Sequence, residues 1–205
     1  MKNVLFLGAH YDDIEIGVGG VLMKHIDAGH KVTICVLCAD EFRTGDPTVR
    51  LKEQMNVLKY LRLSDDSLVC FNTTTEDTDV IKKLDPIKPD ILYIPYEDDS
   101  HQDHRRCSVI GQSVGRKPYI TTLYYGGASV RNFLPNVFVS VDAGRKEFLL
   151  NFFVSQIECG AINIDRVKKR ERYWGTMISS KADSYAEGFV VYKMEIKINE
   201  KTTWF

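Results

Sequence analysis

Short apolar segments of strand length alternate with longer helix-like segments along this chain of 205 residues. Several of the short segments are apolar at consecutive positions, as strands covered by helices on both faces are. Alternation at these lengths is typical of βαβ units and predicts an α/β fold with a mostly parallel sheet. The sequence contains no internal repeat, low-complexity tract or linker, so we expect one domain over residues 1–198 and a tail over residues 199–205.

The expected strands are Val4–Ala9, Lys31–Cys38, Ser67–Phe71, Asp90–Pro95, Ile120–Tyr125, Val137–Val141 and Phe189–Ile198, the last at an antiparallel edge of the sheet. The expected helices are Gly17–Gly29, Thr48–Leu61, Asp77–Leu84, Asp103–Gly115, Arg145–Ile157 and Asp165–Ser179. We expect the first helix to end at Gly29, because glycine readily adopts the left-handed conformation of a C-cap. The predicted architecture is a single-domain, Rossmann-like three-layer α/β/α sandwich.

The balance of charges limits the kinds of partner. The chain has 27 Lys and Arg against 28 Asp and Glu, a net charge of -1, which argues against a broad nucleic-acid or polybasic membrane surface. No apolar stretch approaches the roughly 18–20 residues of a membrane span, and no signal peptide begins the chain. We therefore expect no nucleic-acid partner and no membrane insertion. A homo-oligomer remains open, because Trp204 and Phe205 are apolar tail residues that could form a contact.

The chain has five cysteines, an odd number, and most of them lie in apolar runs. Cys35 and Cys38 have the C-x-x-C spacing of a redox or zinc half-site. They lie inside an expected buried strand, however, and no second pair faces them. We therefore expect reduced core thiols and a cytoplasmic protein.

Residues Gly8–Gly20, with the sequence G-A-H-Y-D-D-I-E-I-G-V-G-G, contain a dense group of reactive side chains. His10, Asp12 and Asp13 directly follow the first expected strand. One imidazole and two carboxylates can supply both metal ligands and a general base. Because Asp12 and Asp13 are adjacent, they cannot easily point the same way. One can bind a metal while the other reaches the metal-bound water.

Two further polar clusters follow expected strands. Asp40, Glu41 and Arg43 follow the second strand, and residues Glu97–His104 follow the strand that ends at Pro95. Ligands of such sheets bind beyond the carboxyl ends of the strands, where the connections change direction. We therefore expect the three clusters to meet at one edge of the sheet.

The segment S-H-Q-D-H, residues 100–104, offers further imidazoles to this edge. His101 and His104 are three positions apart at the start of an expected helix, so they share a face. One can bind a metal while the other stays near a substrate carbonyl, and Asp103 is placed to orient a histidine. Imidazoles and a carboxylate suit zinc, with a fourth position left for water. Chance clustering in a hydrophilic loop is the simpler alternative, but coincidence with the first motif favours a site.

The glycines of Gly17–Gly20 leave a dinucleotide-binding interpretation open, with Asp40 as the acid that binds the ribose. In a G-x-G-x-x-G site, however, the glycines come immediately after the strand. Here that turn carries carboxylates, which would repel a pyrophosphate. We favour glycines that let the first helix pack closely on the sheet.

The segment A-H-Y-D-D-I-E-I-G-V-G-G resembles the A-H-P-D-D-x-E-x-G-x-G-G signature of the PIG-L/LmbE-like family of metal-dependent N-deacetylases, and S-H-Q-D-H is similar to its H-P-D-H motif. F-R-T-G-D, with Arg50 and Glu53 after it, resembles the T-R-G-E loop of the family and the helix that follows. R-Y-W-G-T-M-I through Y-A-E-G-F, residues 172–189, resembles its C-terminal signature. These motifs occur in the family's order and cover nearly the whole chain.

The resemblance implies a set of metal ligands, which are His10, Asp13 and His104. The implied metal is Zn²⁺. Fe²⁺, Mn²⁺ or Co²⁺ could also occupy the site in the cell, because availability as well as affinity decides occupancy.

The resemblance also implies catalytic roles. Asp12 would be the general base on the activated water, and His101 would assist the oxyanion or protonate the departing amine, with Asp103 in support. Tyr11 and Gln102 replace the prolines of the two motifs. Neither change removes a reactive group, but each can alter the turn that aims Asp12 or His101.

The implied substrate is a small N-acetylated amino sugar, such as an N-acetylglucosamine glycoside or conjugate. Arg43 and Arg50 are candidates to bind sugar hydroxyls, a phosphate or a carboxylate, although Arg50 could equally be a helix-surface residue. Tyr96 is a candidate to help the oxyanion. Trp174 and Tyr173 could stack under a sugar, but we favour core packing for them.

Two other functions remain open. One is a related metal-dependent amidase that acts on a thiol conjugate or on an antibiotic or nucleotide-sugar amide. The other is a catalytically inactive member that binds a metal or a carbohydrate.

Overall fold

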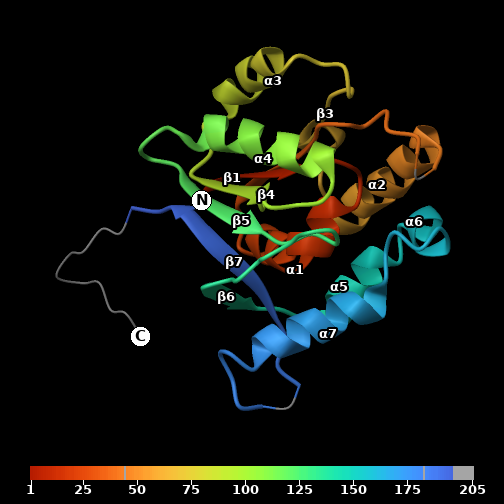
Figure 1. Cartoon of the computed structure of the whole chain (residues 1–205), viewed down its shortest axis with the longest axis vertical. Coiled ribbons are helices and arrows are strands. Elements are labelled where there is room, and N and C mark those ends of the chain that lie inside the picture. The colour runs from red at the N-terminus through yellow and green to blue at the C-terminus, as the bar shows by residue number, and fades with distance from the viewer. Residues whose placement is uncertain (44, 182, 196–205) are drawn as a thin grey trace.

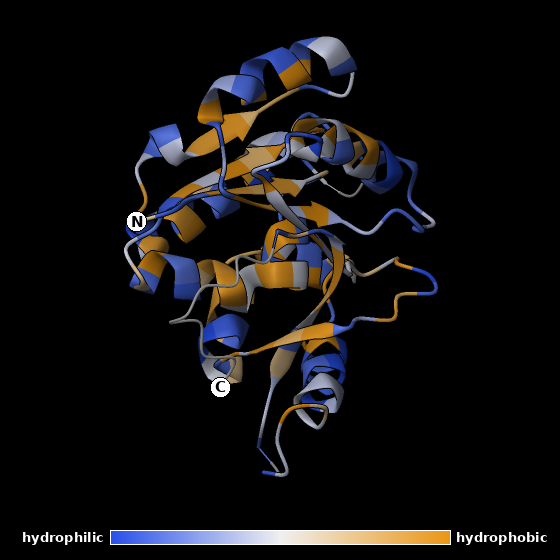
Figure 2. Cartoon of the chain, turned by 90° about the vertical axis from the view of Figure 1, so that its left-hand side faces the viewer, coloured by the Kyte–Doolittle hydropathy of each residue, from blue (hydrophilic) through white to orange (hydrophobic). Residues whose placement is uncertain are grey.

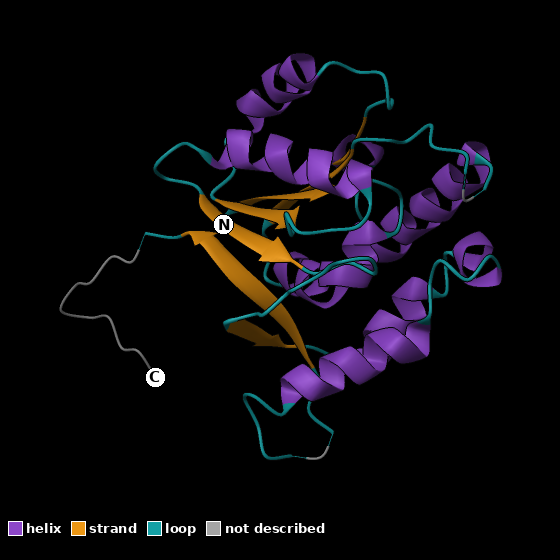
Figure 3. Ribbon diagram, viewed as in Figure 1, coloured by secondary structure: helices purple, strands orange, loops and turns teal. Residues whose placement is uncertain are grey.

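The first expected strand forms β1 (Asn3–Gly8), which lies between two parallel neighbours, β2 (Lys31–Val36) and β4 (Ile91–Pro95). The computed structural model describes residues 1–43, 45–181 and 183–195, and within them seven strands form one sheet in the order β3-β2-β1-β4-β5-β7-β6 (Figure 1; Figure 3). The remaining strands are β3 (Leu68–Cys70), β5 (Thr121–Tyr125), β6 (Val137–Ser140) and β7 (Ala186–Lys193). Among these strands only β7 runs in the opposite direction to the rest, so its pairs with β5 and β6 are antiparallel and the sheet is mostly parallel, as predicted.

Helices cover both faces of the sheet and make the predicted three layers (Figure 1). One face carries α1 (Asp13–Asp27), α2 (Pro47–Leu61), α5 (Ala143–Leu150) and α7 (Ile164–Gly175), and the other carries α3 (Asp77–Leu84) and α4 (Gln102–Gly115). The short helix α6 (Val154–Glu158) follows α5 and contacts α2. Two 3-10 turns, Asp65–Ser67 and Asp85–Ile87, lie before β3 and β4.

The side chains of β1 alternate between two apolar cores, one on each side of the sheet. Val4 and Phe6 join the core under α1, whereas Leu5 and Leu7 join the core under α4. Successive side chains of a strand point to opposite faces, so a strand buried on both faces is apolar throughout. Burial of each such side chain contributes about 1.5–3 kcal/mol. Figure 2 shows the strands mostly in hydrophobic colours and much of the helices' outer surface in hydrophilic ones.

Three helix predictions need correction. The last expected helix, Asp165–Ser179, is α7, which ends at Gly175. α1 begins at Asp13, before the predicted start at Gly17, because the carboxylate of Asp13 accepts the N–H groups of the preceding turn and closes it. The single helix predicted over Arg145–Ile157 is two helices, α5 and α6. The chain leaves helical geometry at Phe153, whose side chain is fully buried in the core.

The last strand was predicted correctly as antiparallel but wrongly as an edge. β7 begins at Ala186, before the predicted Phe189, and lies between β5 and β6, so β6 is the edge strand. Positions 196–198 of the predicted strand, and the predicted tail with Trp204 and Phe205, lie outside the described residues.

The glycines of α1 pack closely on the sheet, as predicted. A Cβ atom at Gly17 would overlap the ring of Tyr125, whose hydroxyl donates a hydrogen bond to the carbonyl of Leu7 at 2.7 Å. Gly29 adopts the predicted left-handed conformation, with φ of 70°, directly after the C-cap residue Ala28. The glycines therefore serve packing and termination of the helix, which removes the main support for a dinucleotide site.

α1 is interrupted at Val18, whose φ of −147° and ψ of 19° are not helical. The interruption separates the first turn, which carries Asp13, from the rest of the helix. The carboxylate of Glu187 on β7 accepts the N–H groups of Gly20 and Val21 at 2.7 and 2.8 Å. An acidic side chain therefore caps the second part of the helix, where unpaired N–H groups and the helix dipole favour a negative charge.

Basic side chains pair the carbonyl that the interruption exposes. The carbonyl of Ile16 accepts hydrogen bonds from Lys146 and Arg170, each at 3.0 Å. Lys146 is fully buried and also forms ion pairs with Glu171 and Glu187. Removal of one partner from such a group would leave a buried charge uncompensated, which is costly.

The direction in which the chain adds strands changes between β1 and β4. From β1 the chain proceeds outward to β2 and β3, and it then returns to place β4 on the other side of β1. Ligands of open α/β sheets bind at such a point, beyond the carboxyl ends of the strands. The turns after β1 and β4 carry the two histidine-containing motifs, so the topology brings them together.

A half-buried histidine predicts how the stability of the fold depends on pH. His25 on α1 contacts His30 Nδ1 through its Nδ1 at 2.7 Å and the Tyr93 hydroxyl through its Nε2 at 3.0 Å. Burial, with a smaller effect of His30, lowers the pKa of His25 from 6.5 to about 4. The unfolded chain therefore binds more protons than the folded chain between these values, so the stabilisation is complete above pH 6.5 and is lost as the pH falls toward 4.

We expect the His25→Gln variant to lose less stability than the wild type on acidification from about pH 7 to about pH 4.5. The difference should be on the order of 2 kcal/mol, after allowance for the partial exposure of the ring. Urea unfolding at several pH values measures it, with the exposed neighbour variant Lys24→Gln as the control. Equal pH dependence in His25→Gln and the wild type would contradict the assignment.

Candidate functional site

The turn after β1 is fixed by a carboxylate at one end and an arginine at the other. Asp13 Oδ2 accepts the N–H groups of Ala9 and His10 at 2.9 and 2.8 Å. The carbonyl of Tyr11 accepts a hydrogen bond from Arg50 Nη2 at 2.9 Å. Between these anchors Asp12 has a positive φ of 102°, which aspartate tolerates better than most residues.

All three residues predicted as metal ligands come together, in this turn and at the start of α4. Potential ligand atoms of His10, Asp13 and His104 all lie within 4.8 Å of one another, and all three residues are buried. His104 Nε2 lies 3.2 Å from Asp13 Oδ1, and His10 Nδ1 lies 3.6 Å from Asp13 Oδ2. Two imidazoles and one carboxylate are a set of donors that suits a divalent metal with an open coordination position.

Electrostatic interactions within this group are strong. Burial disfavours the charged forms of Asp13 and His104, but their mutual attraction outweighs it. The pKa of Asp13 is therefore held well below its usual range, and the pKa of His104 is raised to about 11. The carboxylate of Asp13 is thus ionised and ready to meet a positive charge.

Each histidine of the group also contacts a second carboxylate, through the ring nitrogen that faces away from Asp13. His104 Nδ1 donates to Asp99 Oδ2 at 3.0 Å, and His10 Nε2 donates to Asp103 Oδ2 at 3.2 Å. Asp99 also accepts a hydrogen bond from Ser129 Oγ at 2.6 Å. Such partners fix the tautomer and orientation of metal-binding histidines, leaving His10 Nδ1 and His104 Nε2 toward Asp13.

Asp99 is an important residue of the site that the sequence analysis did not select. It is 1% exposed and holds both His104 and the loop of Ser129 in place. Its position in the polar loop after a buried strand, shortly before His104, was the signal that could have identified it.

Asp103 orients two histidines by different groups. Its carboxylate accepts a hydrogen bond from His10 Nε2, whereas the distance from Asp103 Oδ2 to His101 Nδ1 is 3.8 Å. Its backbone N–H instead donates to His101 Nδ1 at 3.2 Å, so His101 caps the N-terminus of α4. The predicted support of His101 by Asp103 therefore comes from the main chain. Neutral His101 carries its proton on Nε2, and burial together with the neighbouring histidines lowers its pKa.

Asp12 faces the same cavity as the three potential ligands. The cavity has a volume of about 150 Å³, and His101 also lines it. Asp12 Oδ1 lies 3.7 Å from Arg50 Nη2. Burial, with an additional effect of the Asp13 charge, raises the pKa of Asp12 well above its usual range, and Arg50 acts in the opposite direction.

The predicted substrate-binding residues have different environments. Arg50 is 3% exposed and pairs with Glu41 at 3.1 Å as well as with the turn after β1, so it is not a helix-surface residue. Its contacts give it a positioning role, although it also lines the cavity. Arg43 is exposed, and its Nη2 lies 3.8 Å from Asp103 Oδ2. Tyr96 packs against Tyr124 and is not among the residues that line the described cavity, so geometry does not support an oxyanion role for it.

The two aromatic candidates of α7 also differ. Trp174 is buried, contacts Phe133 edge-to-face and lies under the guanidinium of Arg170, 5.0 Å from the ring centroid. These contacts are those of core packing, as favoured. Tyr173 is 61% exposed on the outer side of the helix, which contradicts core packing for that residue.

Segments far along the chain complete the cavity wall. They contribute Ser129 and Ala128 from the loop after β5, Gln156 from α6 and Ala161 from the loop before α7. The sequence analysis did not identify these residues as part of a site, because none belongs to a motif with reactive side chains.

A second group of potential ligands consists of His10, Cys38 and Asp103. Burial raises the pKa of Cys38 to about 12, so its thiol is protonated at neutral pH. None of the five cysteines, all of which lie in the described residues, forms a disulfide, and Cys35, Cys38 and Cys107 are buried. Cys70 and Cys159 are exposed, so the expectation of core thiols holds for three of the five.

Comparison with known proteins agrees with this geometry. A model of the PIG-L family, described as GlcNAc-PI de-N-acetylase, matches residues 5–114, which is more than half of the chain. The chain belongs to the PIG-L family. Its fold is the α/β fold of that family's deacetylases.

Individual proteins are similar to this chain, in sequence or in structure, beyond the residues that the family model matches. An uncharacterized deacetylase of Escherichia coli (strain K12), YaiS, is 29% identical over 160 residues, which cover 68% of this chain and 82% of the relative. A conserved protein of Thermus thermophilus has a similar structure, with a TM-score of 0.79 and 23% identity, over 99% of this chain and 100% of its own. The N,N′-diacetylchitobiose deacetylase of Pyrococcus horikoshii has a TM-score of 0.75 and 20% identity, over 93% of this chain and 83% of its own.

Within the described part of the chain, no helix is both long and apolar enough to cross a membrane.

The contact between Asp99 and His104 predicts an effect on metal binding. We expect Asp99→Asn to weaken the affinity for Zn²⁺ by about 10–100-fold, because His104 loses the carboxylate that orients its Nδ1. Competition with a chromophoric chelator measures the affinity. The matched control is Asp98→Asn, in which the neighbouring carboxylate pairs with Arg131 and not with the histidines. Equal affinities of the two variants would show that Asp99 does not orient a ligand.

Proposed function

We propose that this protein is a metal-dependent hydrolase that removes the N-acetyl group from an amino sugar, such as an N-acetylglucosamine glycoside or conjugate. The observation that carries the proposal is the joint position of the buried group His10, Asp13 and His104 with Asp12 at one small cavity. Membership of the PIG-L family supports the same reaction.

The donor set fits a divalent metal, for which we propose Zn²⁺ with Fe²⁺, Mn²⁺ or Co²⁺ as further candidates. His10 Nδ1, Asp13 Oδ1 and His104 Nε2 would hold it, because their other polar atoms are engaged by Asp103, by the turn after β1 and by Asp99. When bound, such an ion lowers the pKa of a water molecule and polarises the amide carbonyl.

Asp12 is proposed as the general base that takes a proton from the attacking water. It lines the cavity beside the ligand group, and its main chain is fixed by the neighbouring hydrogen bond from Arg50 to Tyr11. That hydrogen bond restrains the turn in which Tyr11 stands in place of the motif's proline. Carboxylates in buried sites commonly serve as general bases.

His101 is proposed to stabilise the oxyanion and to act near the departing amine. Its Nδ1 accepts the N–H of Asp103, so its Nε2–H is the donor available to substrate. A donor held in place before the reaction stabilises developing negative charge without the cost of reorganisation. Gln102, which replaces the motif's proline, begins α4 without disturbing this hydrogen bond.

Arg43 is proposed to bind hydroxyl or anionic groups of the sugar at the rim. Its side chain is 60% exposed and lies beside Asp103 at the edge of a second open hollow that adjoins the site. Arg50 is proposed to act mainly through Asp12, because its guanidinium already binds Glu41 and the carbonyl of Tyr11.

The catalytic assignment predicts different defects for two variants. Asp12→Asn should keep metal affinity within a few-fold of wild type and lower kcat by about 10²–10⁴-fold, the usual contribution of a general base. Asparagine also tolerates the positive φ at this position. His104→Ala should instead lose metal affinity. Metal content and amine release on the zinc-loaded protein measure the two effects, with Asp98→Asn as the control.

Wild-type deacetylase activity in both variants would contradict the mechanism. A panel of acetylated sugars, thiol-conjugate amides and nucleotide-sugar amides, scored by the amine released, separates the deacetylase from the related amidases. Tight zinc binding without turnover of any of these amides would favour the inactive binding protein.

A further inference from the structure

The thiol of Cys38 lies beside the proposed catalytic residues but takes no part in the proposed reaction. Cys38 comes two residues after β2, and its backbone N–H donates to the carbonyl of Ala9 at 2.8 Å. It therefore lies next to the turn that carries His10, and it is 2% exposed. Thiolate sulfur is a preferred ligand of Zn²⁺ and of softer ions, so this buried side chain is a candidate metal ligand.

Cys38 belongs to a second group of potential ligand atoms, together with His10 and Asp103. One such atom from each residue lies within 4.8 Å of the other two. The side chain of Asp103 is 12% exposed, so the group is nearly closed to solvent. Sulfur, imidazole nitrogen and carboxylate oxygen are the three kinds of protein ligand that zinc takes, and a tetrahedral ion here would keep a fourth position for water.

His10 is common to the first group, with Asp13 and His104, and to the second group, with Cys38 and Asp103. Its Nδ1 lies 3.6 Å from Asp13 Oδ2, whereas its Nε2 lies 3.2 Å from Asp103 Oδ2. An ion in the second group would bind Nε2 in place of the proton that Nε2 donates to Asp103. It would also replace the thiol proton, and both protons would pass to solvent. Loss of these protons and repulsion between two cations make the second group the weaker site.

Negative charges outnumber positive ones around the thiol. In addition to burial, the charges of Asp103, Asp40 and Asp13 raise the pKa of Cys38, whereas Arg106 acts in the opposite direction. Arg106 itself forms an ion pair with the first residue of α3, at 2.8 Å. The local field at Cys38 therefore favours a cation.

An open hollow of about 580 Å³ gives access to the second group. Asp103 and Asp40 line this hollow together with Arg43 and Arg106, and Asp103 does not line the catalytic cavity. An ion can therefore reach Asp103 without entering the space proposed for the acetamide.

We propose that His10, Cys38 and Asp103 form a second metal site, which takes a thiophilic divalent ion such as Cd²⁺ or Zn²⁺ in excess. An ion at this site withdraws Asp103 from His10 Nε2 and so disturbs a proposed ligand of the first ion. It therefore inhibits deacetylation. The site itself rests on the geometry of the three side chains, whereas the inhibition rests on the proposed function.

Titration of the reduced full chain with Cd²⁺ tests the site, because cadmium thiolates absorb ultraviolet light by charge transfer and the first group contains no sulfur. The background carries Cys70→Ser and Cys159→Ser, which remove the two exposed thiols. We expect a saturable thiolate band in this background and its loss on addition of Cys38→Ala. Asp103→Asn, which keeps the thiol, should shift the band to higher Cd²⁺ concentration. His104→Ala, which removes a ligand of the first group alone, should retain it.

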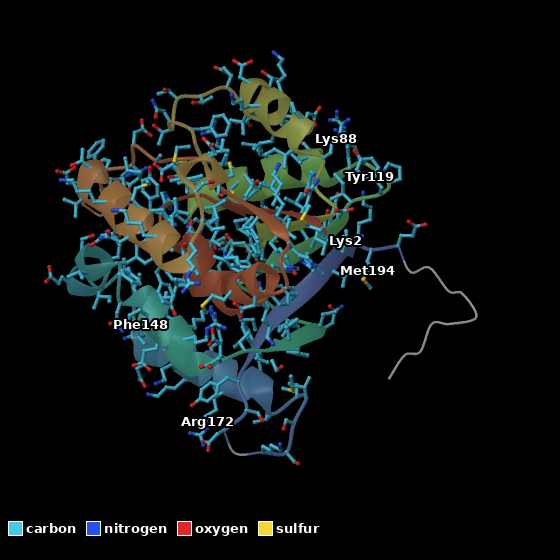
Figure 4. The ribbon with its side chains drawn as sticks, turned by 180° about the vertical axis from the view of Figure 1, so that it is seen from behind. Lys2, Lys88, Tyr119, Phe148, Arg172 and Met194 are labelled. Carbon is cyan, nitrogen blue, oxygen red and sulfur yellow. The ribbon has the colours of Figure 1, made fainter. Side chains whose placement is uncertain are left out.

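The matched control is Cys107→Ala. Cys107 is a buried thiol in the same apolar core as Cys38, but it belongs to neither group of potential ligands. Its substitution should leave the band unchanged. His25 and His30, which contact each other, lie at the opposite edge of the sheet, where Figure 4 labels Lys2. Cadmium bound by these imidazoles would persist in Cys38→Ala and adds no thiolate band.

Amine release tests the inhibition. Zn²⁺ beyond one equivalent should lower the activity of the background protein, and Cys38→Ala should shift this inhibition to higher Zn²⁺ concentration. Absence of the band, or a band that Cys38→Ala keeps, would overturn the second site. A band accompanied by unchanged activity in excess Zn²⁺ would overturn the inhibition. If the band forms as expected but no amide is hydrolysed under any metal loading, the second site stands and the proposed function fails.

Discussion

The carboxylate of Asp13 is the group on which the geometry of the site depends. One oxygen accepts two N–H groups of the turn after β1, and the other faces His104 at the start of α4. A single side chain therefore closes the turn, begins α1 and joins two segments from opposite sides of the switch point. The desolvation cost of this buried charge is offset by those hydrogen bonds and by the nearby imidazole.

A second group of buried charges supports the helix that carries Asp13. The interruption of α1 at Val18 separates the first turn from the remainder, and the peptide groups it exposes are paired by Glu187, Lys146 and Arg170. These ions compensate for lost main-chain hydrogen bonds, because buried polar groups are costly when unpaired. The C-terminal motif thus acts on the site through α1, and Arg170 also reaches the loop after β5 that lines the catalytic cavity.

The strand pattern and the two histidine motifs were predictable because their signals are local. Periodicity marked every strand of the sheet, and the parallel order then placed His10 and His104 at one edge. The start of α1, the separation of α5 from α6 and the interior position of β7 were not predictable, because each depends on tertiary packing or pairing. Phe153, for example, ends α5 by entering the core and not by any helix-breaking chemistry.

The sequence alone determined the fold class, the chemical types gathered at the switch point and the resemblance to a deacetylase family. Only the tertiary structure decided which carboxylate orients which histidine: Asp103 serves His10, 93 positions away in the sequence, and Asp99 serves His104. It also placed Arg50 under the turn of Asp12. The physical reason is that the residues of a short segment determine its local propensity and its chemical types by themselves. Orientation and electrostatic pairing arise only when distant segments exclude water and face one another.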